Sequence, residues 1–229
     1  MICLQKAGGF AAFLQALAYI VGFVVLATLL NPGDTESWTA AQKLEFVLER
    51  KHAFQAWMLF IYVVFGIALV VSASALHERL KENQPGMMQV ATAFGLIWAG
   101  LVIASGMVAS VGIESVSALN DKSPGQAESL WLAVGAVQLG LGGGVEIVGG
   151  AWMLLVSIAT LRHAAFAKTL GYLGALVGVA GILTIAPPLR DLGTLFGLGQ
   201  IIWFVWIGLV LLRRPAIDEP SKSMLAGRA

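Results

Sequence analysis

Long stretches without a charged side chain constrain this chain more than any other feature. Five of them are close to or above the ~20 residues that a helix needs to cross a bilayer core of about 30 Å: residues 7–30, 53–76, 90–113, 169–187 and 194–212. Charged residues make up 12% of the chain and the mean hydropathy is +0.84, whereas a soluble domain has about 25% charged residues. The sequence therefore predicts an integral membrane protein and excludes a water-soluble globule.

The stretch 127–161 is harder to assign, because Glu128 and Glu146 are its only charged residues. It is too short for two spans of about 20 residues each and a turn. As one straight helix it would be about 50 Å long, which exceeds one span. Clustered glycines weaken a helix, and they occur here at positions 140 and 142–144. We therefore expect a lead-in helix over 127–139, a break at the glycines and a span over 140–161, which makes six spans.

Basic residues predict the orientation, because they are more frequent in cytoplasmic loops. With the N-terminus in the cytoplasm, five basic residues are outside and nine are inside: Lys6, Arg79, Lys81, Arg162, Lys168, Arg213, Arg214, Lys222 and Arg228. We therefore expect an all-α bundle over residues 1–214 with both termini in the cytoplasm. The polar tail 215–229, which contains two prolines, is predicted to be a disordered cytoplasmic segment.

Residues 34–51 predict a helix on the external side, between the first two spans. Thr39 and Gln42 have the spacing of a capping box. Apolar residues recur on one face and charged residues on the other, as in a helix that lies in the membrane interface. The alternative is that this helix extends the second span outward.

Glu146 is the leading candidate for a functional residue. An ionisable side chain inside a membrane is costly and is a functional hypothesis by default. Gly143 and Gly144 next to it leave room for a ligand or a neighbouring helix, and Gln138 and Gln200 are further polar residues within the spans. These five residues form the candidate ligand-binding set. The alternative is that Glu146, in its neutral form, hydrogen-bonds a neighbouring helix.

Three charged residues are expected at the external ends of the spans, namely Glu114, Arg190 and Asp191. Together with Gln138 and Gln200 they are candidates for an outward-facing polar vestibule that leads to Glu146. The alternative is ordinary charge at the membrane interface.

Several other classes of site are not predicted. The net charge of +1 argues against a nucleic-acid partner. Cys3 is the single cysteine, so no internal disulfide can form. His52, His77 and His163 are at span ends rather than facing each other within the membrane, as a haem site would require. We expect no metal, no cofactor and no catalytic residues.

Three segments carry a family resemblance: GGGVEIVGGAW at 142–152, LGYLG at 170–174 and ALHERL at 75–80. They resemble stretches common in an uncharacterised family of bacterial six-helix integral membrane proteins, classed as a domain of unknown function. Val145 stands where that family often has Asn or Gly. The resemblance implies six spans in a bacterial cytoplasmic (inner) membrane, and it implies no activity.

Three functions remain open from the sequence. The leading hypothesis is a carrier or binding protein for a small, partly apolar molecule, with its site around Glu146. The second is a non-catalytic membrane subunit or structural partner of another membrane protein, which the absence of a catalytic constellation favours. The third is a membrane redox enzyme. An enzyme is the less favoured class.

Overall fold

The computed structural model describes residues 2–163 and 166–213, which contain helices and no strand. The α-helices are α1 (Ile2–Ala27), α2 (Ala40–Glu49), α3 (Lys51–Met58), α4 (Phe65–Leu80), α5 (Pro85–Asn120), α6 (Pro124–Gln138), α7 (Ile147–Leu161), α8 (Lys168–Leu183) and α9 (Leu192–Leu212). Two π-helical turns, η1 (Leu59–Val64) and η2 (Leu139–Gly143), and a 3-10 turn, η3 (Pro187–Leu189), lie between them. The all-helical prediction is confirmed over this part of the chain. The predicted tail 215–229 lies outside the described residues.

Five helical segments are long and apolar enough to cross a membrane. They are Leu4–Ala27, Lys51–Leu80, Pro85–Asn120, Pro124–Leu161 and Leu192–Leu212. The remaining expected span corresponds to α8, which is apolar but has 16 residues and is therefore about 24 Å long. It ends at Leu183 rather than at the predicted residue 187, because residues 184–186 form a turn before the proline pair.

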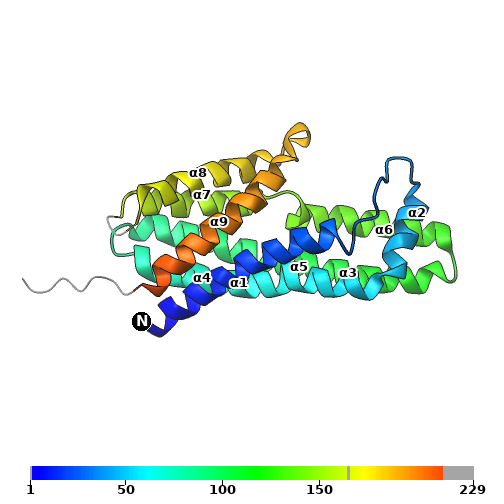
Figure 1. Ribbon diagram of the computed structural model, residues 1–229, viewed down its shortest axis with the longest axis horizontal. Coiled ribbons are helices and arrows are strands. Elements are labelled where there is room, and N and C mark those ends of the chain that lie inside the picture. The colour runs from blue at the N-terminus through cyan, green and yellow to red at the C-terminus, as the bar shows by residue number, and fades with distance from the viewer. Residues whose placement is uncertain (1, 164–165, 214–229) are drawn as a thin grey trace, which may run out of the picture.

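The long helices run side by side along the long axis of the molecule (Figure 1). The helices α2, α3 and α6 lie at one end with the C-terminal part of α5, whereas α7, α8 and α9 lie toward the other end. Helices α1 and α9 are antiparallel, since Gly9 lies close to Gly208 and Gly197 lies close to Phe23. The start of α1 and the end of α9 are therefore at the same end of the bundle.

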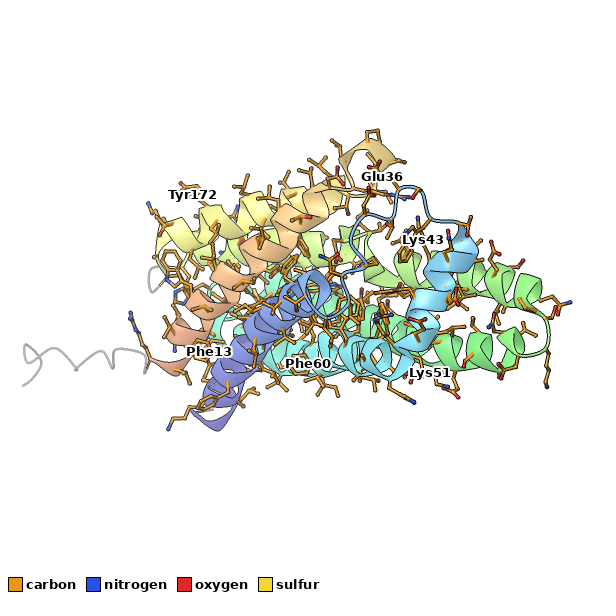
Figure 2. All side chains as sticks on the ribbon, turned by 45° about the vertical axis from the view of Figure 1, so that its right-hand side comes forward. Phe13, Glu36, Lys43, Lys51, Phe60 and Tyr172 are labelled. Carbon is orange, nitrogen blue, oxygen red and sulfur yellow. The ribbon has the colours of Figure 1, made fainter. Side chains whose placement is uncertain are left out.

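Large apolar side chains cover the outside of the long helices. Phe10, Val111, Tyr172 and Ile202 are each more than half exposed, and Figure 2 shows Tyr172 pointing away from the bundle. A surface of this kind is unfavourable in water and suits the acyl chains of a lipid bilayer. The fold is that of a membrane protein.

A cluster of aromatic rings fills the centre of the bundle. Its six members come from α4, α5, α7 and α9, and each is at most 4% exposed: Phe65, Trp98, Trp152, Phe196, Trp203 and Phe204. The ring centroids of Trp98 and Trp152 are 5.5 Å apart, and those of Trp152 and Trp203 are 5.7 Å apart. Pairs at this spacing add about 0.5–1.5 kcal/mol each beyond the burial of their surface. The cluster fixes these four helices relative to one another.

Glycines bring α7 and α8 into backbone contact. A Cβ atom on Gly150 would lie 2.6 Å from the Gly178 carbonyl oxygen, and one on Gly178 would lie 2.8 Å from the Gly150 carbonyl oxygen. Close approach of this kind stabilises helix pairs in lipid, where the hydrophobic effect between helices is weak. These glycines therefore determine how tightly the two helices pack.

The chain between α6 and α7 leaves the helical conformation at Gly142, which has φ of 108°. Residues 144–146 are not helical, and α7 begins at Ile147. Helix α7 therefore begins seven residues after the start of the predicted segment 140–161, whose first residues belong to the π-helical turn η2. Glu146 lies in the break immediately before α7, rather than within a helix, because the turn extends past the glycine cluster.

Helix α2 begins at Thr39 with the predicted capping box, in which Thr39 Oγ1 accepts from the Gln42 amide and Gln42 Oε1 accepts from the Thr39 amide. The apolar face of α2 packs against protein: Leu44 is buried with Val116 of α5 and Ala127 of α6. Arg50 separates α2 from α3, with φ of −115°. The helix therefore lies across the ends of α5 and α6, a contact that neither sequence-based alternative includes.

Candidate functional site

A cavity of about 370 Å³ lies between α1, η1, α5, the start of α9 and the break before α7. Its polar or charged lining side chains include Glu146 and Arg190, and the rest of the wall consists mainly of aromatic, aliphatic and glycine residues. The aromatic lining residues are Tyr19, Phe23, Trp57, Tyr62, Phe65, Trp98 and Phe196. A concave, mostly apolar cavity with a few polar groups is the usual form of a small-molecule site.

The glycines of the break give this part of the wall its shape. Gly142 has a positive φ that favours glycine. A Cβ atom on Gly143 would lie 2.8 Å from the Gln138 carbonyl oxygen, and one on Gly144 would lie 2.7 Å from Leu139 Cδ1. Larger residues would therefore open the turn, and all three glycines line the cavity with bare backbone.

Helix α8 holds the break in position through one side chain. Thr184 is fully buried, and its Oγ1 accepts a 2.8 Å hydrogen bond from the Glu146 amide. The same hydroxyl donates a 2.7 Å bond to the Gly181 carbonyl oxygen. The Glu146 carbonyl oxygen in turn accepts the Gly150 amide at 2.7 Å, in the first turn of α7. The backbone of Glu146 is thus fixed on both sides.

The Glu146 carboxyl group differs from the backbone of the same residue in its hydrogen bonding. Within residues 2–163 and 166–213, no side chain or amide forms a hydrogen bond or ion pair with it. Tyr19 and Tyr62 line the same cavity as Glu146. Glu146 is half-buried, and a carboxylate that is partly removed from water without a partner is costly. The cavity is the space into which a partner for this group would fit.

Aromatic contacts keep the cavity wall in one arrangement. The ring of Phe65 packs edge-on against Tyr19 at 5.3 Å and against Trp98 at 5.6 Å. The Trp57 indole N–H donates to the Gly22 carbonyl oxygen at 3.3 Å. These contacts join wall residues from α1, α3, α4 and α5.

The indole N–H of Trp98 is a second polar group without a partner on this wall. Trp98 is 2% exposed, and its Nε1 has no hydrogen-bond acceptor in the described part of the chain. A buried indole N–H usually finds an acceptor.

The structure brings together only part of the set predicted from the sequence. Glu146, Gly143, Gly144 and Arg190 line the cavity. Gln138 lies behind the wall, beside Gly143, and its carbonyl oxygen accepts from Ser105 Oγ at 3.2 Å.

Gln200 is not at the cavity. It is fully buried on α9, and neither side-chain amide atom has a hydrogen-bond partner among the described residues. From its depth along the helix, Gln200 was expected at the entrance of the predicted vestibule. It lies instead on the side of α9 that faces the core, and the sequence alone does not give that side.

The expected vestibule is not formed as predicted. Glu114 lies on α5 beside Gln55 and Lys51, with its carboxylate oxygens 3.5 Å and 3.8 Å from their side-chain nitrogens. Asp191 is exposed before α9 and does not line the cavity. Of the three charged residues, Arg190 alone is part of the cavity wall, because α5 carries Glu114 past the level of the cavity.

Sequence reasoning missed the aromatic wall. None of its seven rings is among the candidate site residues predicted from the sequence. Aromatic residues in an apolar helix have no local pattern that separates a cavity wall from a packed core. The described residues contain no group of three or more His, Cys, Asp or Glu side chains that could hold a metal ion.

Comparison with known proteins assigns the chain to a family. Residues 7–214 match the family described as a domain of unknown function (DUF4386). No curated protein and no solved structure matches the chain. Because the match extends over nearly the whole length, this chain belongs to the DUF4386 family.

Proposed function

We propose that this protein binds a small, partly apolar molecule in the cavity at Glu146, and that it acts as a carrier or binding protein in a bacterial cytoplasmic membrane. The observation that supports this most strongly is the combination of an unpartnered carboxyl group with a cavity lined by aromatic side chains. The glycine break supports it as well, because non-helical backbone at membrane depth is tolerated where it lines a cavity or is buried in protein.

The topology that goes with this proposal has six spans, with both termini in the cytoplasm. It includes α8 as the fifth span, and the excess of basic residues on the inner side supports it. In this orientation α2 is external. Glu36, Lys43 and Lys51 lie at the same end of the molecule as α2 (Figure 2).

The break before α7 lies level with the middle of the uncharged part of α5 and with the external end of α8, where Thr184 accepts from the Glu146 amide. The uncharged part of α5 extends over residues 90–113. Val102, near the middle of this stretch, is the neighbour of Gly142, and Trp98 packs against Gly149. The break therefore lies about halfway along the membrane-spanning part of α5.

The cavity residues support access from the external side. In this topology Leu26 is at the external end of α1, and Trp57 lies in α3, the external part of the second span. Arg190, Gly193 and Thr194 are at the external start of α9. A carrier also needs an arrangement that opens inward, and the non-helical residues before α7 provide a position for such a movement.

A cavity-filling substitution tests the proposal. A Cβ atom on Gly193 would meet only Thr184 Cγ2, at 4.0 Å, so Gly193→Trp is expected to be accommodated and to fill the cavity entrance. Gly100→Trp is the matched control, because Gly100 is exposed on α5 with no atom within 4 Å of its Cβ position. The ligands are two probes of the same shape, the cation phenyltrimethylammonium and neutral tert-butylbenzene.

Calorimetric titration in detergent is the measurement. We expect at least one probe to bind the unmodified protein and the Gly100→Trp variant, and neither to bind Gly193→Trp. Binding that survives Gly193→Trp, or no binding to any of the three proteins, would contradict the proposal.

A further inference from the structure

We infer that the ligand of this cavity is an organic cation, namely an amine or quaternary ammonium compound whose charged group lies beside Glu146 and against the aromatic rings. This inference rests on the proposed function and adds the chemical class of the ligand. It depends on three observations: the acidic group that lines the cavity, the kind of side chain around it and the number of acidic groups.

The first observation is the charge. Glu146 is the acidic residue among the cavity-lining residues, and none of the described residues forms an ion pair with it. Interaction between opposite charges is stronger in a water-poor cavity than in bulk water. A cationic ligand would therefore gain a charge pair there and remove the cost of the unpartnered carboxylate.

The second observation is the wall. Seven of the 20 lining residues are aromatic. The faces of such rings attract an ammonium group, and an arrangement of several rings is a known means of binding quaternary ammonium compounds. Tyr19, Tyr62 and Glu146 line the same cavity, so a ligand there faces both the rings and the carboxyl group.

The third observation separates an organic cation from a metal ion. A divalent metal ion needs several oxygen or nitrogen ligands. The described residues contain no cluster of three such acidic, histidine or cysteine side chains, whereas an ammonium ion of low charge density is matched by one carboxylate and aromatic faces.

Arg190 does not oppose this assignment. It is exposed at the mouth of the cavity, between η3 and α9, where water and salt screen its charge. Glu146 lies at the break, further inside than Arg190. The preference of the cavity for a cation or an anion therefore depends on Glu146. A cavity of about 370 Å³ also accommodates a compact aromatic ammonium ion.

The test compares phenyltrimethylammonium with tert-butylbenzene, which has the same shape without the charge. The unmodified protein should bind the cation at least about tenfold more tightly, a difference that calorimetry resolves. Glu146→Gln should weaken binding of the cation by about tenfold or more. It should leave the affinity for tert-butylbenzene unchanged, which would also show that this variant is folded. Glu36→Gln removes an exposed carboxylate outside the cavity and should leave both affinities unchanged.

Equal affinities in the unmodified protein, or a preference for the cation that survives in Glu146→Gln, would overturn the inference. If tert-butylbenzene alone binds and Gly193→Trp abolishes that binding, the proposed function stands and the cationic class is wrong. If neither probe binds, both are wrong.

Discussion

The amide of Glu146 donates a 2.8 Å hydrogen bond to the hydroxyl of Thr184, which lies 38 residues away at the end of α8. This bond joins the non-helical break before α7 to a neighbouring helix. It leaves the Glu146 carboxyl group free to face the cavity, because the backbone is held by other atoms. The position of the candidate site therefore depends on a contact between two helices.

Removal of the Thr184 hydroxyl is expected to destabilise the fold. Thr184→Val has nearly the same shape but leaves the Glu146 amide without its acceptor. An unsatisfied buried donor costs about 1–3 kcal/mol, so thermal unfolding in detergent should shift to lower temperature. Thr184→Ser keeps the hydroxyl and should unfold closer to the unmodified protein. An unchanged midpoint for Thr184→Val would show that this bond does not stabilise the break.

Substitution of Glu146 itself is expected to preserve the fold. Because no described residue partners the carboxyl group, both Glu146→Gln and Glu146→Leu should unfold at or above the temperature of the unmodified protein. A structural role would give another result: Leu would lower the midpoint and Gln would leave it nearly unchanged. Thermal unfolding of the two variants side by side distinguishes these roles.

The contact between α7 and α8 should not tolerate a methyl group. Gly150→Ala would place a Cβ atom 2.6 Å from the Gly178 carbonyl oxygen, and overpacking of this kind costs about 1–3 kcal/mol or more. We expect a lower unfolding temperature and less monodisperse protein in gel filtration. Gly100→Ala is the control, with nothing within 4 Å, and should be neutral or slightly stabilising because alanine favours helix. Similar behaviour of the two variants would contradict the packing described for these helices.

The proposed orientation predicts which loops face outward. In a Cys3→Ser background, cysteines at positions 40 and 122 should react with an impermeant thiol reagent added to the outside of cells. A cysteine at position 82, in the exposed turn after α4, should react only after the cytoplasmic side is made accessible. The reverse pattern at position 40 or 122 would show that the orientation is wrong.

The helices could be predicted from the sequence because a long uncharged run has few other solutions in a bilayer. The break was predicted from its glycines, but not its extent. Contacts from elsewhere in the chain accompany the break, since Val102 of α5 lies beside Gly142 and Thr184 after α8 bonds the Glu146 amide. The π-helical turn at Leu59–Val64 has no sequence signal that we recognise.

The candidate site was predictable to the extent that one residue stood out chemically. Glu146 was identified because a carboxyl group in an apolar run is unusual. Gln200 and Glu114 were grouped with Glu146 by their depth along their helices. Gln200 instead lies on the side of α9 that faces the core, and Glu114 lies further along α5, beside Lys51. Tyr19 and Phe65 were not identified, because their role arises only when α1 and α4 come together.

Access to position 146 from the external side is the most direct test of the central claim. In a Cys3→Ser background, Glu146→Cys would be treated from outside with a small impermeant reagent, 2-(trimethylammonium)ethyl methanethiosulfonate, and its labelling rate followed by mass spectrometry. Ser157→Cys, at a fully buried position, serves as the unreactive control. The account predicts that Glu146→Cys is labelled and that adding Gly193→Trp slows this labelling strongly. Labelling no faster than that of Ser157→Cys, or a rate indifferent to Gly193→Trp, would contradict it.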